Sequence, residues 1–287
     1  MALSLPGVPK RLRTSASLTT TESRWLLWPP VLFFVIALGA PLVDLVVQSF
    51  SDGSNGFAGI LTLSVFGGAV IRTIVLAAVV TVVSMVLGVA YAFAISLAPF
   101  WLRIVLLIGL VISLWTSSLV RSFGWMLLEL PKGAIFWFLQ LVGLGDQPVS
   151  LYQTALGMYP AMISIMLPFA ALPLVSAIAA IDRELLSAAT VYGAGSMLTI
   201  RKVVLPQIGS AMISGGVLVF VMSLGFYVTP VLLGGPSNLT VSGLINLQLG
   251  TADRPDLAAA ISILLTGGTL LIYLVADRLF RVSEKWG

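Results

Sequence analysis

The sequence predicts an all-α polytopic membrane protein with six transmembrane helices. Its 287 residues are 59% hydrophobic and only 9% charged, and the mean hydropathy is +1.08. So few charged residues cannot cover the surface of a soluble protein of this size. Six apolar runs, separated by polar breaks, are long enough to cross a hydrocarbon core, which takes about 20 helical residues. A soluble globular protein is therefore excluded.

The polar breaks set the boundaries of the six predicted spans. Pro160, Pro168 and Pro173 interrupt the fourth span, either as tolerated kinks or as a bend around a translocation path. Between the third and fourth spans, a short helix with an aromatic anchor is expected in the outer interface over residues 130–141. The spans are expected at residues 28–50, 70–98, 102–127, 154–180, 207–233 and 257–280.

The distribution of basic residues predicts the orientation. An even number of spans puts both termini on the same side of the membrane, and cytoplasmic loops carry the excess of Lys and Arg. With both termini inside (N-in, C-in), the outer side holds only Arg72, Arg121, Lys132 and Arg254. The cytoplasmic side then holds Lys10, Arg11, Arg13, Arg24, Arg103, Arg183, Arg201, Lys202, Arg278, Arg281 and Lys285. This orientation puts the loop 181–207 in the cytoplasm.

The loop 181–207 carries the signals of two helices joined by a turn. Asp182 is expected to cap a first helix whose first turn contains Glu184, and Gly193 to end that helix in a left-handed conformation. Ser196 is expected to cap a second short helix that continues into Leu205-Pro206. An apolar stripe on the first helix has spacings of three and four residues and comprises Leu185, Ala188, Ala189 and Tyr192. We interpret the loop as a docking surface for a partner outside the bilayer.

The same loop resembles the cytoplasmic EAA loop of ABC-importer permeases. The family pattern is Glu-Ala-Ala, three residues, Gly, nine residues, an aliphatic residue, one residue, then Leu-Pro. This chain keeps every spacing, with Ser187 in the Glu position, so the carboxylate for a salt bridge to the ATPase is absent. The matching positions are Ser187-Ala188-Ala189, Gly193, Val203 and Leu205-Pro206.

Three further motifs resemble the spermidine/putrescine group of these permeases. They are Trp115-Thr116-Ser117 with Val120-Arg121, Ala171-Leu172-Pro173-Leu174, and Tyr227-Val228-Thr229-Pro230 with Leu233-Gly234-Gly235. The resemblance covers nearly the whole chain beyond the N-terminal tail. It implies a type I ABC-importer transmembrane domain over residues 25–287, with its family core at about 70–280 and a coupling loop at 181–207. Residues 1–24 are expected to be a disordered basic cytoplasmic tail.

The resemblance also implies the partners and the location. The chain contains no GxxxxGK[ST] phosphate-binding loop, so we expect no catalytic residue, cofactor or metal ion on this chain. ATP and magnesium would be used by two separate cytoplasmic ATPase subunits. A second permease subunit, expected to be a related but different chain, and a periplasmic solute-binding protein complete the system in a bacterial inner membrane. Nucleic acid is not expected as a partner. The implied solutes are small and hydrophilic: polyamines, opines or amino compounds.

Ionisable residues inside the predicted spans are candidates for the solute pathway. Such residues at membrane depth usually face the bundle interior or a watery cavity. Asp44, Arg121 and Glu129 lie toward the outer face, where they either line the pathway or pair with one another or with headgroups. The family motifs add Trp115, Tyr227 and Thr229 to this list.

Two alternatives to an ABC-importer permease are a secondary transporter and a membrane enzyme. A secondary transporter is expected to show inverted repeats and acidic or histidine proton relays within the membrane. Asp44 and Glu129 keep that alternative open, although no such repeat is visible. A membrane enzyme would need converging acid–base or metal groups, and the chain has no His, no Cys and only scattered carboxylates.

Overall fold

The computed structural model describes residues 28–51, 55–143 and 151–280, and within these ranges the chain forms helices and no strand. The predicted tail at residues 1–24 lies outside them. The chain begins with α2 (Trp28–Gln48), α3 (Gly56–Thr62), α4 (Ser64–Leu97), α5 (Phe100–Trp115), α6 (Ser118–Glu129) and α7 (Ala134–Leu141). It continues with α8 (Ala155–Ala179), α9 (Arg183–Val191), α10 (Ser196–Thr199), a π-helical turn (Ile200–Val204) and α11 (Leu205–Leu224). The last elements are α12 (Val228–Leu233), a 3₁₀ turn (Pro236–Asn238), α13 (Val241–Gly250) and α14 (Pro255–Phe280).

Five helical segments of the described chain are long and apolar enough to cross a membrane. They are Trp28–Gln48, Ser64–Leu97, Ala155–Ala179, Ser196–Leu224 and Pro255–Phe280. The α5–α6 pair makes a sixth if it is taken as one span, but its two helices meet at an angle of 101°. The all-α, multi-span prediction is therefore confirmed, and the third span expected over 102–127 consists of two helices that meet at a bend. The chain bends at Thr116 and Ser117, which are both extended, and Ser117 is the N-terminal capping residue of α6.

The fifth predicted span ends nine residues earlier than expected. α11 ends at Leu224, with Gly225 as its C-terminal capping residue, and the motif around Tyr227 begins the separate helix α12. The segment after Gly234, expected to be a polar break, contains α13. That helix packs against α14 and α4, with Val241 and Leu244 buried. The short helix expected before the fourth span is confirmed as α7.

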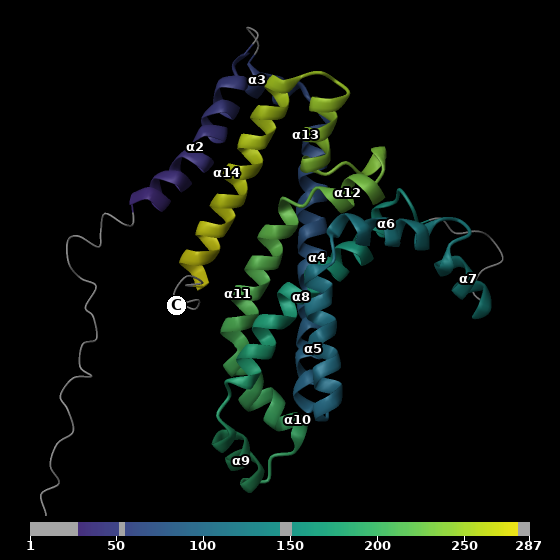
Figure 1. Cartoon of the computed structure of the whole chain (residues 1–287), viewed down its shortest axis with the longest axis vertical. Helices are drawn as coiled ribbons and strands as arrows, with labels where there is room; N and C mark the ends of the chain where they lie inside the picture. Colours follow the sequence, from purple (N-terminus) through teal and green to yellow (C-terminus); the bar gives the residue numbers. More distant parts are fainter. Residues whose placement is uncertain (1–27, 52–54, 144–150, 281–287) are drawn as a thin grey trace, which may run out of the picture.

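The core lies among α4, α8 and α11, which stand side by side along the long axis of the molecule (Figure 1). Leu76 and Val80 of α4 meet Met162 and Met166 of α8 and Val219 of α11, and all five are buried. α4 and α8 lie close together at Gly88, where a Cβ atom would lie 3.1 Å from the Ala170 Cβ. A second apolar cluster joins α3, α4, α13 and α14.

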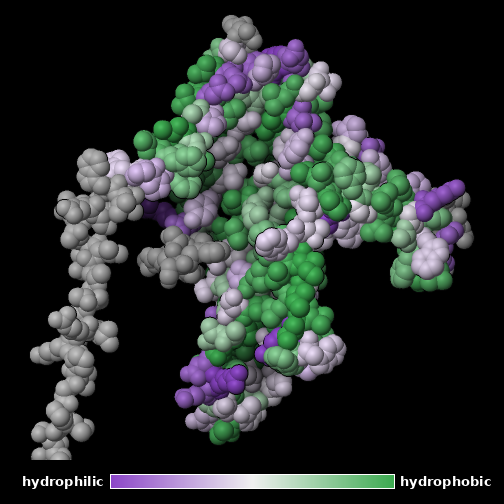
Figure 2. All heavy atoms as spheres, in the orientation of Figure 1, coloured by the Kyte–Doolittle hydropathy of each residue, from purple (hydrophilic) through white to green (hydrophobic). Residues whose placement is uncertain are grey.

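The two ends of the molecule differ from its middle in polarity. Figure 2 shows hydrophilic side chains gathered around α9 at the lower end and around the upper end, with hydrophobic side chains between them. α9 and α10 form the lower tip in Figure 1. The predicted docking loop therefore projects from one end of the bundle, beyond α4 and α8.

Candidate functional site

The first helix of the loop 181–207 is built as its sequence predicts. Asp182 Oδ1 accepts a hydrogen bond of 2.9 Å from the Glu184 N–H, which satisfies one of the free amides at the start of α9. Glu184 in the first turn adds a favourable charge at the positive end of the helix dipole. Ile181, directly before the cap, is buried against α4 and α11 and anchors the loop to the bundle.

Gly193 ends α9 in the predicted left-handed conformation, with a φ of +80°. The Gly193 N–H donates to the Thr190 carbonyl at 3.0 Å, and the Ala194 N–H reaches back to the Ala189 carbonyl at 2.9 Å. The second bond spans five residues, as in a Schellman motif, and satisfies a carbonyl at the helix end. This turn sets the angle at which the chain leaves the docking helix.

The second half of the loop differs from the prediction. Gly195, and not Ser196, is the capping residue of α10, and no side chain caps that helix, so the expected Ser196 cap is wrong. α10 also runs through the π-helical turn into α11 as one 29-residue helical segment. The Leu205 N–H bonds to the Ile200 carbonyl, five residues back. Pro206 has no N–H to donate, and a local π adjustment is one of the ways in which a membrane helix accommodates a proline.

The loop exposes an apolar surface that no described part of the chain covers. The side chains of Leu185, Val191, Tyr192 and Met197 are 48%, 84%, 90% and 77% exposed. Ala188, Ser187 and Pro206 are also exposed, while Ala189 and Leu205 are half-buried. The Ser187 hydroxyl donates to the Arg183 carbonyl within α9. Val191 and Met197 were missed by sequence reasoning, because they lie off the predicted stripe and become exposed through the turn at Gly193.

Behind this surface lies a cavity of about 330 Å³ between the loop and the ends of α4 and α8. Its lining is mainly apolar and includes Phe93, Leu97, Ile178, Leu186 and Val204. The loop is therefore attached to the bundle through Ile181 and Leu186 but is not packed solidly against it. This arrangement leaves room for the loop to shift relative to α4.

Arg121, a predicted pathway residue, lies at the α5–α6 bend and binds backbone carbonyls. Its Nη1 donates to the Ser164 carbonyl of α8 at 2.9 Å. Its Nη2 donates to the Ser113 carbonyl, near the end of α5, and to the Thr116 carbonyl at 3.4 Å. Neither Arg121 nor Glu129 forms an ion pair with any described residue, so the two do not pair with each other.

Glu129, at the end of α6, is 1% exposed, and neither carboxylate oxygen has a hydrogen-bond partner among the described residues. The carboxylate lies against Gly157 in the first turn of α8, where an added Cβ would be 2.6 Å from Glu129 Oε2. A buried polar group without partners is costly, and one in a native protein calls for an explanation. The positive end of the α8 dipole is the nearest favourable field for this carboxylate.

The remaining predicted pathway residues divide between two places. Thr229 of α12 is fully buried and shares a 2.8 Å hydrogen bond with Ser122 of α6. Tyr227 is 43% exposed and donates to Asn246 of α13, and Trp115 at the end of α5 is 87% exposed. These residues, with Arg121 and Glu129, lie on or beside the α5–α6 and α12 elements.

Asp44 does not join that group. It is exposed on α2 and accepts a 2.8 Å hydrogen bond from Gln48. α2 packs against α14 and has no buried residue, and Figure 1 draws it on the opposite side of the molecule from α6. Pairing of Asp44 with Arg121 or Glu129 is therefore wrong for this structure.

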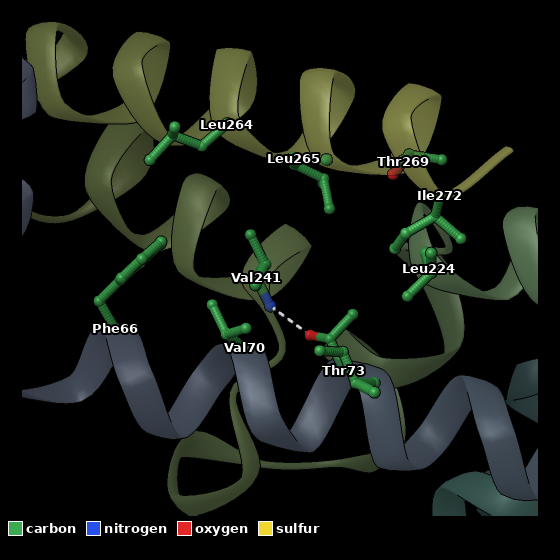
Figure 3. Close-up of a pocket in the computed structure, with 11 residues that line it drawn as sticks. Phe66, Val70, Thr73, Leu224, Val241, Leu264, Leu265, Thr269 and Ile272 are labelled. Carbon is green, nitrogen blue, oxygen red and sulfur yellow. Dashed lines mark hydrogen bonds between the residues drawn. The ribbon is translucent and has the colours of Figure 1, made fainter. Parts of the chain in front are cut away.

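An apolar cavity of about 170 Å³ separates α4 from α13 and α14 (Figure 3). Phe66 and Val70 of α4 face Leu264 and Leu265 of α14 across it. At its edge, the Thr73 hydroxyl accepts a 2.9 Å hydrogen bond from the Val241 N–H, which fixes the start of α13. No charged side chain lines this cavity, so it is unsuited to a hydrophilic solute.

The described residues contain no group of three or more His, Cys, Asp or Glu side chains that could hold a metal ion. Two regions are the candidates for function: the exposed loop 181–207 at one end, and the bent, partly polar α5–α6 region.

Comparison with known proteins identifies relatives over most of the chain. The sequence model of the family "binding-protein-dependent transport system inner membrane component" matches residues 84–286. The spermidine/putrescine transport system permease protein PotB of Salmonella typhimurium is 34% identical over 215 residues, which cover 73% of this chain and 75% of the relative. Its namesake from Escherichia coli is 33% identical over 72% of this chain and 76% of its own length.

Solved structures show the same fold. A chain from the crystal structure of a bacterial ABC transporter involved in the import of the acidic polysaccharide alginate superposes with a TM-score of 0.79. The superposition covers 91% of this chain and 96% of that chain, at 21% sequence identity.

Proposed function

Because this chain belongs to the family of inner membrane components of binding-protein-dependent transport systems, we propose that it carries small cationic amino compounds of the polyamine class across that membrane. It is an inner membrane permease subunit of an ABC importer. The observation that carries the proposed solute class is the 33–34% identity to spermidine/putrescine permeases over nearly three-quarters of the chain. Family membership also favours an ATP-driven permease over the secondary transporter.

Fold alone does not select the solute. The matching crystal structure belongs to an importer of an acidic polysaccharide, and one fold commonly serves many ligands. The exposed rings of Trp115 and Tyr227 support a cationic solute, because aromatic faces attract ammonium groups. Trp115 ends α5, Tyr227 precedes α12 and Glu129 ends α6, and we place the solute pathway along these elements.

Energy is proposed to enter through the loop 181–207. The exposed apolar side chains Leu185, Val191, Tyr192 and Met197 form a surface of the kind that protein partners cover. The proposed partner is a cytoplasmic ATPase, present as two subunits that bind ATP and magnesium. A second permease subunit, related but different, and a periplasmic binding protein that delivers the solute complete the proposed complex.

The test is solute uptake by the whole transporter. The chain is expressed with its neighbouring ATPase, permease and binding protein in a bacterium that lacks its own polyamine uptake, and uptake of labelled putrescine and spermidine is measured. We expect ATP-dependent uptake that disappears when the binding protein is omitted. If mass spectrometry of the copurified binding protein instead shows an opine, an amino acid or another solute, the proposed polyamine class is wrong.

A further inference from the structure

The carbonyl oxygen of Ser164 in α8 lacks its usual partner because of Pro168. In an α-helix this carbonyl accepts a bond from the N–H four residues later, and a proline at that position has none. A buried carbonyl needs another donor. Arg121 supplies it from α6, with Nη1 at 2.9 Å from the Ser164 oxygen.

The other end of the same guanidinium group satisfies the end of α5. Nη2 donates to the carbonyls of Ser113 and Thr116, which lie at the end of the helix and in the bend. A cation is favourable at this negative end of the α5 dipole. One planar side chain therefore joins α5, α6 and α8 at the 101° bend.

Neighbouring bonds reinforce this junction. Trp125, one turn further along α6, donates through its indole N–H to the Ser164 hydroxyl at 3.1 Å. Ser122, next to Arg121, shares the buried hydrogen bond with Thr229 of α12. α6 is thus bonded both to the middle of α8 and to α12.

We propose that Arg121 is a positioning residue that clamps the α5–α6 bend to the proline-interrupted middle of α8, so that α6 and α12 follow α8 when the docking loop moves. α8 ends at Ala179, and only residues 180–182 separate it from the docking helix α9. A displacement of α9 therefore reaches α8 directly. The clamp then passes the displacement on to α12, which contains Thr229 and begins directly after Tyr227. This inference rests on the proposed coupling role of the loop.

A double-mutant cycle isolates the bond to Ser164. Arg121→Gln is expected to lower solute-driven uptake by roughly tenfold, the effect of losing one charge-assisted hydrogen bond, while basal ATP hydrolysis persists. In a Pro168→Ala background, the new N–H satisfies Ser164, so Arg121→Gln should cost less. Pro173→Ala is the matched control, because it removes a proline of the same helix whose partner carbonyl Arg121 does not touch. An equal cost of Arg121→Gln in all three backgrounds would overturn the proposal.

A distance measurement tests the clamp independently of solute and uptake. The chain has no native cysteine, so spin labels can be placed at exposed Val120 of α6 and exposed Ser176 of α8. The assembled transporter should give one narrow distance distribution, the same without ATP and in an ATP-trapped state. Arg121→Gln should broaden it, and Arg121→Lys should broaden it too, because a single ammonium group lacks the two separate, planar NH2 groups with which Arg121 reaches α8 and α5. A narrow distribution in both variants would refute the clamp, whereas failure of wild-type polyamine uptake would refute only the solute class.

Discussion

The turn at Gly193 gives the sharpest test of the docking loop, because the same loop contains a matched control glycine. Gly193 has a φ of +80°, whereas Gly195 has a φ of −67° and a ψ of 161°, which any residue adopts. A Cβ added at either position would meet no heavy atom within 4 Å. Gly193→Val and Gly195→Val therefore differ in backbone strain and not in steric contact.

The expected difference follows from the cost of the left-handed conformation. It is about 1–2 kcal/mol for an ordinary L-residue and is highest for β-branched residues. At about 2 kcal/mol, the loop would adopt its docked shape roughly 30-fold less often. Gly193→Asn should be tolerated, because asparagine adopts positive φ more readily than other side chains.

The assay is binding-protein-stimulated ATP hydrolysis by the reconstituted transporter, together with copurification of the ATPase. Gly193→Val should lose most of both, while Gly195→Val and Gly193→Asn should retain them. Membrane insertion of all three should be equal, since the strain is local to the loop. If Gly193→Val and Gly195→Val behave alike, the turn does not set the docking geometry and our reasoning fails.

Three further predictions concern other parts of the chain. Gly157→Ala should lower the melting temperature of the purified complex, because its Cβ would lie 2.5 Å from the Leu151 carbonyl oxygen. Gly209→Ala is the control and should leave the melting temperature unchanged, because a Cβ there meets no atom within 4 Å. Equal melting temperatures of the two variants would contradict the packing at Gly157. Glu129→Gln should leave the melting temperature unchanged or higher, because it removes a buried charge that has no partner among the described residues; a clear drop would show that the carboxylate is bonded in the assembled transporter. Reporter fusions after residues 99–103 and within 183–201 should report cytoplasm, and fusions within 131–148 and 234–256 periplasm; the reverse pattern would refute the proposed orientation.

The parts of the site that sequence reasoning predicted correctly are those encoded by near neighbours. The Asp182 cap involves an amide two residues away, and the Gly193 turn closes over five residues. Both follow from the local preferences of Asp and Gly at helix ends. The Ser196 cap was wrong because two adjacent residues, Gly195 and Ser196, were both suited to that position.

The bend between α5 and α6 could not be predicted in the same way. Long apolar stretches flank the three consecutive hydroxyl residues Thr116, Ser117 and Ser118, so hydropathy shows one span and only these three residues hint at a break. The sequence shows only the depth of each charged residue along its span, whereas the role of that residue depends on which helices are neighbours. Arg121 meets a carbonyl 43 residues away, and Asp44 lies on a helix that packs elsewhere.

The structure also changes how the basic residues bear on the proposed orientation. Three of the residues assigned to the outer side are held by the chain itself: Arg72 by the Leu239 carbonyl, Arg121 by backbone carbonyls, and Arg254 by Asp256, which raises the pKa of Arg254. In contrast, Arg183, Arg201 and Lys202 are exposed and form no ion pair with any described residue. The positive-inside rule acts on basic residues near the ends of the spans, and a guanidinium group already bound inside the bundle is a weaker topology signal. The Arg254 side chain is 47% exposed, so it is kept in the comparison. Arg72 and Arg121 on the outer side are discounted, as is Arg103 on the cytoplasmic side, because Arg103 also donates to backbone carbonyls, those of Ile95 and Ser96. The charge difference between the two sides still increases, which supports a cytoplasmic docking loop.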